Sequence, residues 1–503
     1  MNNFDVVIIG SGMGGLVCAD ILCKEGYKVC VLEKNKQIGG CLQTYVRDKV
    51  IFDSGVHYLG GLGKGQNLYQ LFKYLGIMDK LKLQKMDEDV FDKIIIENDD
   101  KEYVYAQGYE NFIQHLLKDF PAEEKGIRLF CEKIKYVCSK FPLYNLRSGG
   151  DINEKTTVLE MDTRAFIESV TTDKKLQAVL AGNNMLYVLQ SDKTPFYVHA
   201  MILNSYIESS WKCIDGGSVI GKYIVQNIRN QGAVIHRNSE VKKIIVEEGK
   251  VSSVQLADGS NIYGKNFISN MHPVKTLEMT ETNIIKHAYK NRIKSLENSI
   301  GGFIINIVLK KDSFKYIKHN YYYHKEDRVW DMTDHTAENW PLGYALFCSA
   351  SSKSGEFAES VTLLAYMRYD EVKQWENTFN TVSVEDDRGA DYEAFKNNKA
   401  AILFDCVEEK FPGLRNCIKS YYTATPLSYR DYIGTDDGSM YGIVKDYRNP
   451  LKTFISPRTK LPNLYLTGQN LNLHGILGAS MSGLVTCIAF MGNETIVEKI
   501  RNA

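Results

Sequence analysis

The chain opens with an apolar strand, a glycine-rich turn and a helix, and no other feature constrains its fold as strongly. The stretch FDVVIIG is continuously apolar, as in strands that are covered on both faces. It leads through SGMGG into the helical stretch LVCADILCKEGY, and a second apolar strand, KVCVLEK, ends at Glu33. A GxGxxG turn between strand and helix, with an acid about 20 residues later, predicts a Rossmann-type unit that binds a dinucleotide.

Each residue type in this unit has a physical role. Gly10 permits the tight turn, Gly12 lets the backbone approach a pyrophosphate, and Gly15 allows close packing of helix on strand. The helix N-terminus faces the phosphates, and Glu33 accepts hydrogen bonds from a ribose. The predicted cofactor-binding residues of this unit are Gly10, Gly12, Met13, Gly14, Gly15, Glu33 and Lys34. A chance match is common for an isolated GxGxxG, but the flanking elements argue against it; FAD and NAD both stay open at this point.

Length and composition narrow the class of protein. A chain of 503 residues is expected to form two domains, and 44% apolar with 24% charged residues is ordinary for a globular protein. Lys plus Arg and Asp plus Glu number 61 each, so no net charge favours nucleic acid as a partner. Eleven cysteines without CxxC pairs or Cys/His clusters indicate reduced thiols and no metal site.

The same features bear on localisation. The first strand begins too early to leave room for a signal peptide, and no apolar run reaches the roughly 18 residues of a membrane span. We therefore expect a soluble, cytoplasmic protein, and peripheral contact with a membrane stays open.

The stretch after the second strand carries a resemblance to a known family. EKNKQIGGCLQTYVRDKVIFDSGVHYLGG resembles the FAD-binding segment of the phytoene desaturases, carotenoid isomerases and retinol saturases. GGC from Gly39 and FDSGVHYLG from Phe52 are most similar to the retinol saturase and carotenoid isomerase branch. The resemblance implies that Gly39 and Gly40 pass beside the FAD pyrophosphate and ribityl arm. It also implies that His57, in the G-x-H of the family pattern, lies near the flavin ring.

A second piece resembles the same family from Gly216 onward. A helix is followed by the strands AVIH and EVKKIIVE, a hairpin that turns at ADGS, and a last strand FISN. The resemblance implies that the backbone around Val241 borders the adenine and that Asn270 to Pro273 close this piece near the cofactor.

A third piece, YLTGQNLNLHGILGASMSG, contains a second glycine-rich turn near the end of the chain. Its strand ends at Gly468 and Gln469, where many flavoproteins of this fold have an acid and the retinol saturase-like branch has TGQ. The N-terminus of the helix that follows, with Leu477 and Gly478, is expected to face the flavin N1–C2=O edge and to stabilise the reduced ring.

These pieces predict an α/β fold with a discontinuous Rossmann-like FAD-binding domain of the glutathione-reductase and amine-oxidase type. We assign residues 1–65, 206–280 and 456–503 to this domain. Residues 66–205 and 281–455 are assigned to an inserted α+β substrate domain with a helical cap and a mixed sheet. From about residue 65 to 205 the pattern is mostly helical, and IGGFIINIVLKK and ESVTLLAYMRY are predicted strands of the sheet. KKDSFKYIKHNYYYHKEDR, basic and rich in tyrosine, is predicted to be a solvated sheet edge, with a membrane-facing surface as the alternative.

The resemblance also implies an activity. ATPLSYRDYIGTDDGSMYGI resembles a TPL passage of the retinol saturase and carotenoid isomerase branch. An FAD enzyme is implied that adds, removes or rearranges hydrogen at carbon–carbon double bonds of apolar polyenes or prenyl-like lipids, with hydride exchange at flavin N5. No second complete GxGxxG marks a nicotinamide domain, so electrons are expected to come from NAD(P)H or another transient donor.

Two other readings compete with this one. An amine oxidase shares the overall fold, but the TPL passage and the LTGQ ending argue against it. A flavin-free prenyl-lipid binding protein of the GDP-dissociation-inhibitor type shares the architecture but departs from the third glycine of the first turn, which is intact here as Gly15. The sequence contains no paired carboxylates, Ser/His/Asp order or HExxH that would favour hydrolysis or metal catalysis.

Candidates for catalysis and substrate contact are few. His57 is the candidate catalytic residue, with His272, His474 and Tyr58 as alternatives, although a lone histidine is more often structural. The aromatic stretch around Tyr187, Phe196, Tyr197, Tyr206 and Trp211 is either core or the lining of an elongated apolar cavity. The predicted substrate-contacting residues are Tyr58, Tyr197, Tyr206 and His474.

Overall fold

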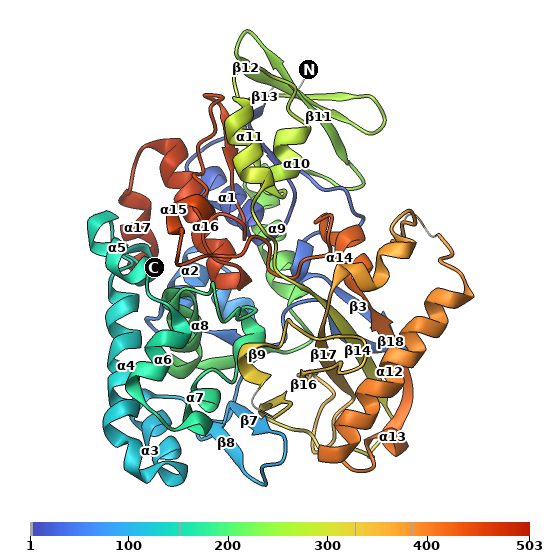
Figure 1. Ribbon diagram of the computed structural model, residues 1–503. Coiled ribbons are helices and arrows are strands. Elements are labelled where there is room, and N and C mark those ends of the chain that lie inside the picture. Colours follow the sequence, from blue (N-terminus) through green and yellow to red (C-terminus); the bar gives the residue numbers. More distant parts are fainter. Residues whose placement is uncertain (1–3, 150–151, 327, 383, 385) are drawn as a thin grey trace.

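The computed structural model describes residues 4–149, 152–326, 328–382, 384 and 386–503. Two seven-stranded sheets organise the described chain, and each is covered on both faces (Figure 1). The fold class is the α/β class predicted from the sequence.

The first sheet carries the Rossmann-type unit. Its parallel strands, in spatial order, are β10 (Val234–His236), β2 (Val29–Leu32), β1 (Phe4–Ile9), β13 (Asn261–Ser269) and β19 (Leu464–Leu466). The first half of β13 also pairs with β12 (Lys250–Leu256), which forms a hairpin with β11 (Val241–Glu247). The predicted hairpin strand and FISN are therefore one continuous strand, because β13 is long enough to leave the hairpin and join the parallel sheet.

Helices and a hairpin enclose this sheet. Apolar residues of alternating orientation, such as Val6 and Val7, are fully buried on opposite faces. One face packs on α1 (Met13–Lys24), α9 (Ser218–Asn230) and α16 (Gly475–Met491). The other packs on the β11–β12 hairpin and on α10 (Pro273–Glu278) and α11 (His287–Lys294). Burial on both faces explains why these strands are continuously apolar.

The second sheet is mixed, as predicted. Its order is β18 (Ile418–Ala424), β14 (Gly301–Leu309), β17 (Ser360–Met367), β16 (Gly343–Cys348), β15 (Asn320–His324), β7 (Asp92–Ile96) and β8 (Glu102–Tyr105). All neighbours are antiparallel except β15 and β7, which are parallel. The β7–β8 hairpin interrupts the region predicted to be mostly helical, because its short apolar run is completed as a strand only by pairing with the distant β15.

Helices cover both faces of this sheet (Figure 1). The long helix α12 (Ala390–Lys410) packs on one face. The other face is covered by α3 (Tyr109–Asp119), α4 (Glu124–Ser139), α6 (Thr163–Val170), α7 (Lys174–Leu180) and α8 (Phe196–Glu208). The remaining helices of the described chain are α2 (Asn67–Tyr74), α5 (Ile152–Leu159), α13 (Leu414–Cys417), α14 (Pro426–Ile433), α15 (Pro450–Thr453) and α17 (Thr495–Arg501).

The remaining described strands are short and form two small antiparallel sheets. A hairpin is formed by β3 (Thr44–Arg47) and β4 (Val50–Asp53). A three-stranded antiparallel sheet joins β5 (Leu59–Gly60), β9 (Ser210–Cys213) and β6 (Leu83–Lys85).

The tyrosine-rich basic segment does not form a solvated edge. Its NYYYH part is β15, which lies inside the sheet between β16 and β7 and is buried along its whole length. Exposed residues lie on both sides of this strand, with Lys310, Lys311, Lys315 and Lys318 before it and Glu326 after it. The prediction was wrong because charges beside a strand do not show which strands pair with it. One of the two neighbours of β15 is β7, where the partner of Asn320, Asp92, lies 228 residues away in sequence.

Candidate functional site

The first glycine turn lies at the carboxyl end of β1 and begins α1. The Gly10 N–H donates to the Leu32 carbonyl at 2.8 Å, and Gly10 has a φ of +95°, which favours glycine. A Cβ added at Gly12 would lie 2.7 Å from Asn270 Nδ2. A Cβ at Gly15 would lie 2.3 Å from the Gly10 carbonyl oxygen. A side chain at Gly15 would therefore clash with the backbone of the turn, and one at Gly12 would displace the end of the Asn270 side chain.

The second glycine turn meets the first one. A Cβ at Gly14 would lie 2.9 Å from the Gly468 Cα, and one at Gly468 would lie 2.5 Å from Asn270 Oδ1. Further along α16, a Cβ at Gly483 would lie 2.9 Å from the Gly14 carbonyl oxygen. The two turns, far apart in sequence, thus come into backbone contact around the side chain of Asn270.

Glu33 stands at the end of β2, and its carboxylate is buried. Oε2 accepts hydrogen bonds from the Ser11 amide at 3.0 Å and hydroxyl at 2.5 Å, and Oε1 accepts from the Asn35 amide at 2.9 Å. The Ser239 amide donates to the Glu33 carbonyl at 2.8 Å, which brings the start of β11, with the buried Val241, beside this acid. The acid thus borders both the glycine turn and the predicted adenine edge.

Lys34 points away from the turn. Its Nζ donates to the Asp431 carbonyl at 2.8 Å, and burial lowers the pKa of this lysine despite nearby carboxylates, Glu33 foremost. Its side chain therefore ties β2 to α14. Lys34 was predicted to bind the cofactor, but its side chain is directed at another part of the protein.

The glycine pair Gly39–Gly40 lies against the first turn. The Gly39 amide donates to Ser11 Oγ at 3.1 Å, and a Cβ at Gly40 would lie 3.2 Å from the Gly12 Cα. Both glycines have positive φ, +119° and +57°. The loop that contains Gly39 and Gly40 therefore lies beside Ser11 and Gly12, next to the N-terminus of α1.

The last turn leads into α16, whose first residue is Gly475. Gln469 is half-buried, and Gly478 lies so close to the loop before the helix that a Cβ would be 2.4 Å from the Leu473 carbonyl oxygen. Leu477, one residue earlier, lines a cavity. The absence of side chains along both turns, the two helix N-termini and the acid at the end of β2 fit a bound dinucleotide.

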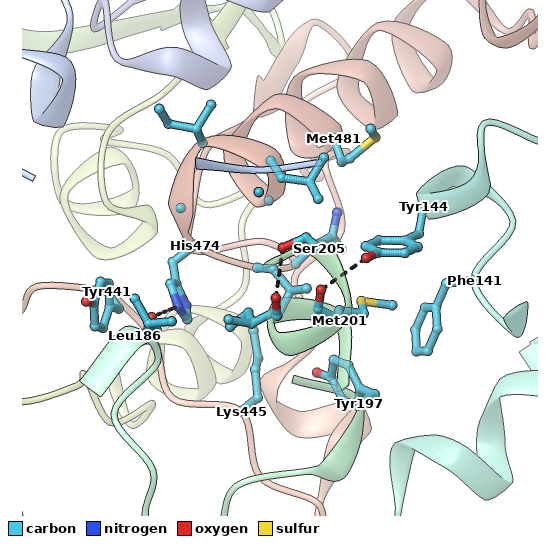
Figure 2. A pocket seen from close by; sticks show the side chains of 18 of the residues that line it. Phe141, Tyr144, Leu186, Tyr197, Met201, Ser205, Tyr441, Lys445, His474 and Met481 are labelled. Atoms are coloured by element: carbon cyan, nitrogen blue, oxygen red, sulfur yellow. Dashed lines mark hydrogen bonds between the residues drawn. The ribbon is translucent and has the colours of Figure 1, made fainter. Parts of the chain in front are cut away.

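A cavity of 460 Å³ extends from the N-terminus of α16 into the layer of helices over the second sheet. Figure 2 shows His474 and Tyr441 on one side, Phe141 and Tyr144 on the other, with Met201 and Lys445 between them. All four predicted substrate-contacting residues line it: Tyr58, Tyr197, Tyr206 and His474. The wall is dominated by aromatic, leucine and methionine side chains.

The rest of the predicted aromatic stretch is not part of this wall. Phe196 is fully buried in the core against Phe166, and the Tyr187 hydroxyl is hydrogen-bonded to His199 Nδ1 at 2.6 Å. Trp211 lies on β9, outside the lining. Along α8 the helical period alternates residues between core and cavity, so an unbroken aromatic stretch cannot line a cavity as a whole.

The histidines near the cavity are held neutral. Burial lowers the pKa of His474 to about 4, and its Nε2 donates to the Leu186 carbonyl at 2.9 Å, so the ring carries its proton there. His57 stacks on Phe347 with ring centroids 4.4 Å apart, and burial, assisted by Lys212, lowers its pKa to about 4. His272 caps α10, accepting from the Val274 amide at 3.3 Å, and does not line the cavity.

Two groups at the cavity were missed from the sequence. Lys445 lines it, and its Nζ donates to the carbonyls of Asn470 and Leu471, each at 3.1 Å. Burial lowers the pKa of this lysine to about 7. Asp92 is fully buried behind the cavity wall, where its carboxylate contacts the hydroxyl of Tyr58. An acid within the apolar stretch VFDKIII is the sequence signal that could have drawn attention to Asp92.

Comparison with known proteins agrees with this geometry. The sequence model of the NAD(P)-binding Rossmann-like domain matches residues 8–75, which span the first turn, Glu33 and the Gly39–Gly40 pair. Human all-trans-retinol 13,14-reductase is 26% identical over 99% of this chain and 87% of its own length. The chain is homologous to the all-trans-retinol 13,14-reductases along nearly its whole length. A prolycopene isomerase of Daucus carota is 26% identical over 96% of this chain and 79% of its own length, so the resemblance predicted from the sequence is confirmed.

A solved structure supports the fold. An oxidoreductase from Methanosarcina mazei superposes with a TM-score of 0.65 at 16% identity, covering 97% of this chain and 100% of that one. Among the residues that the structure describes, no helix is long and apolar enough to cross a membrane. In the same part of the chain, no group of three or more His, Cys, Asp or Glu side chains could hold a metal ion.

Proposed function

We propose that this chain is an FAD-dependent oxidoreductase that acts on carbon–carbon double bonds of an apolar polyene or isoprenoid lipid. The observation that carries the proposal is the cavity: one end of its wall is the glycine turn that begins α16, and the rest is largely apolar. Cavities of this volume with mostly apolar walls bind small hydrophobic molecules. The relatives named for retinol and prolycopene reactions support the same class of substrate.

FAD is the cofactor that the proposal requires. The residues that would hold it are Gly10, Gly12, Met13, Gly14, Gly15, Glu33, Gly39, Gly40, Val241, Gly468, Gln469, Leu477 and Gly478. To these we add Asn270, whose side chain lies between the two turns. Lys34 keeps a supporting role through its bond to Asp431. When bound, the flavin would supply hydride exchange at its N5 atom.

Cofactor binding and substrate binding are assigned to the regions around the two different sheets. We propose that residues 1–65, 206–280 and 456–503 bind FAD and that 66–205 and 281–455 bind the substrate, with Tyr58, Tyr197, Tyr206 and His474 contacting it. The catalytic candidate from the sequence, His57, also lines the cavity, but its low pKa means that at neutral pH it acts from the uncharged form. Reduction, desaturation and isomerisation are all compatible with these contacts, and NAD(P)H or another transient donor would reduce the flavin.

The test begins with colour. The purified chain, supplied with FAD, should show the absorbance of a bound oxidised flavin; a colourless protein would leave only the flavin-free prenyl-lipid binding alternative. Anaerobically reduced protein is then mixed with all-trans-retinol, poly-cis lycopene and other polyenes, and reoxidation of the flavin is followed. An amine panel added to the oxidised protein tests the amine oxidase alternative: flavin reduction by amines with no response to polyenes would reject the proposal.

The cavity mouth suggests how an apolar substrate enters. Leu451 and Phe454, on and beside α15, line the cavity yet are 69% and 51% exposed. Arg292 holds this segment through the carbonyls of Lys452 and Phe454. We propose peripheral contact with a lipid surface at this point, because exposed apolar side chains at the rim of a lipid cavity favour transfer from a membrane.

Vesicle binding tests the membrane contact. The Leu451→Ser, Phe454→Ser double variant should lose sedimentation with phosphatidylcholine vesicles and retain the bound flavin. The matched control is Val382→Ser, which removes another exposed apolar side chain, 78% exposed and outside the cavity lining.

All eleven cysteines are free, which supports a reducing, cytoplasmic location for the protein.

A further inference from the structure

A buried carboxyl group and two phenols form a continuous chain behind the cavity. Asp92 Oδ2 accepts a hydrogen bond from the Tyr58 hydroxyl at 2.8 Å, and the hydroxyls of Tyr58 and Tyr322 are 2.7 Å apart. Asp92 Oδ1 accepts from Asn320 Nδ2 at 2.9 Å. Asp92 is fully buried, whereas Tyr58 and Tyr322 both line the cavity. The chain therefore runs from the interior of the second sheet to the space that we propose for the substrate.

Strand register places these groups. In the parallel pair of β7 and β15, Asp92 is aligned with Asn320, and Tyr322 follows two residues later on the same face. Tyr58 comes from the segment between β4 and β5, and Tyr206 of α8 stacks on it with ring centroids 4.3 Å apart. The rings are thus fixed by a sheet on one side and a helix on the other.

Burial makes Asp92 a group that changes protonation near neutral pH. Burial raises its pKa to about 7, against the hydrogen bonds from Asn320 and Tyr58. The charged group that faces it is Lys212 of β9, whose own pKa burial lowers to about 8 and whose Nζ donates to the Cys348 carbonyl at 2.9 Å. The other titratable groups facing Asp92 are the hydroxyls of Tyr58, Tyr105, Tyr206 and Tyr322.

We propose that Asp92, Tyr58 and Tyr322 form a proton relay that delivers a proton to the substrate carbon during double-bond reduction. The proposal rests on the proposed function and specifies its proton donor. When Asp92 is ionised, the hydrogen bonds run toward it: Tyr322 donates to Tyr58, and Tyr58 donates to the carboxylate. When Asp92 is protonated, the direction reverses, and the Tyr322 hydroxyl is left free to donate into the cavity.

The proton balance is as follows. The O–H bond of Tyr322 breaks and a C–H bond forms, using the electron pair of the substrate's π bond. The other hydrogen, with two electrons, would come from a bound reduced flavin. Tyr322 regains a proton from Tyr58, and Tyr58 regains one from Asp92, which becomes a carboxylate. Asp92 takes up a proton from bulk solvent between turnovers, which restores the starting state. One proton therefore leaves the carboxyl group for each double bond reduced.

The two histidines that line the cavity are poor proton donors for this step. His474 commits its one ring proton to the Leu186 carbonyl, and a neutral His57 is a much weaker acid than an imidazolium. Lys445 commits its ammonium to the backbone carbonyls of Thr453, Asn470 and Leu471. Tyr322 is the cavity-lining hydroxyl at the far end of the chain that begins at the buried acid Asp92.

Two measurements on the FAD-loaded protein test the relay. Infrared difference spectroscopy should show a carboxylic acid C=O band that disappears as the pH rises through about 7, is missing in Asp92→Asn, and shifts in Tyr58→Phe. This readout requires no substrate. A wild-type protein without the band at pH 6 would overturn the relay, even if it reduced a polyene.

Single-turnover reoxidation of the reduced protein by a polyene is the second measurement. Asp92→Asn, Tyr58→Phe and Tyr322→Phe should each slow it by roughly 100- to 10,000-fold with flavin spectra unchanged, and Asp92→Asn should lose the decline in rate above neutral pH. The control is Tyr344→Phe, on the opposite face of the same sheet, where the buried hydroxyl has no hydrogen-bond partner among the described residues. A Tyr322→Phe rate equal to that of Tyr344→Phe would refute the relay. If no polyene reoxidises the wild type, the proposed function fails, and the infrared titration still decides whether the relay exists.

Discussion

Adding one methyl group at Gly15 should damage both folding and cofactor binding, for a reason that the first turn makes explicit. The new Cβ would lie 2.3 Å from the Gly10 carbonyl oxygen, whereas real Cβ atoms essentially never approach within 3.0 Å. The neighbouring atom is backbone, so no side chain can swing aside. The contact is relieved only if α1 moves away from β1 or the turn opens.

The magnitude follows from two opposing effects. Overpacking that moves backbone costs about 1–3 kcal/mol, while Ala is favoured over Gly in a helix by up to about 1 kcal/mol. We therefore expect Gly15→Ala to lower the free energy of unfolding by about 1–2 kcal/mol. Gly12→Ala differs, because its Cβ meets only the end of the Asn270 side chain, at 2.7 Å, which can turn away. That variant should keep its stability but place a methyl group where the pyrophosphate would approach.

Urea unfolding of the cofactor-free protein and titration with FAD separate the two cases. Both variants should bind FAD at least about 100-fold more weakly, equivalent to about 2.7 kcal/mol, but only Gly15→Ala should unfold at lower urea. Gly126→Ala is the control for overpacking alone, since its Cβ would lie 2.2 Å from the Val170 carbonyl oxygen, away from both turns. It should lose stability and retain FAD affinity. If Gly15→Ala matched wild type in urea, the close approach of α1 to the turn would be refuted.

Three further predictions concern buried charges. Asp431→Ala should cost about 3–5 kcal/mol of stability in urea unfolding, because it leaves Arg388 and Arg430 without their buried partner; a loss below about 1 kcal/mol would contradict this. Between about pH 4 and pH 7 the folded chain holds a proton on Asp92 that the unfolded chain releases, so wild type should lose roughly 2–4 kcal/mol relative to Asp92→Asn as the pH rises through this window. If the difference between the urea midpoints of the two proteins were the same at pH 5 and at pH 7, this proton uptake would be excluded. Lys445→Met should destabilise the protein by about 1–3 kcal/mol and speed amide hydrogen exchange in residues 468–474, where the ammonium holds the carbonyls of Asn470 and Leu471. Unchanged exchange there would show that the loop does not depend on Lys445.

The parts of the molecule that the sequence predicted are those whose physics is local. The turn from Gly10 to Gly15 requires glycine because of contacts within a few residues, and β1 is apolar because both faces are covered. The predicted fold class was confirmed for this reason. The buried state of β15 was missed because it depends on β7, and Asp92 and Asn320 are 228 residues apart in the chain.

The cavity shows the same limit. Tyr58 was identified beside the G-x-H pattern and Tyr197 within an aromatic stretch that suggested an apolar cavity, and both line the cavity. Tyr322 was not, because in NYYYH three consecutive tyrosines look alike, and only strand pairing turns the middle one toward the cavity. Its neighbours Tyr321 and Tyr323 pack on the opposite face.

The meeting of the two glycine turns has a consequence for biosynthesis. Strand β19 and helix α16, which complete the site that we propose for FAD, leave the ribosome long after the first glycine turn. The second sheet also closes late, since β7 cannot join β15 until residue 324 has been made. Contacts of such sequence separation form slowly, and the first sheet stays incomplete until β19 has been synthesised. A chain that terminates early would expose the unpaired edge of β13 and have no means of retaining the flavin.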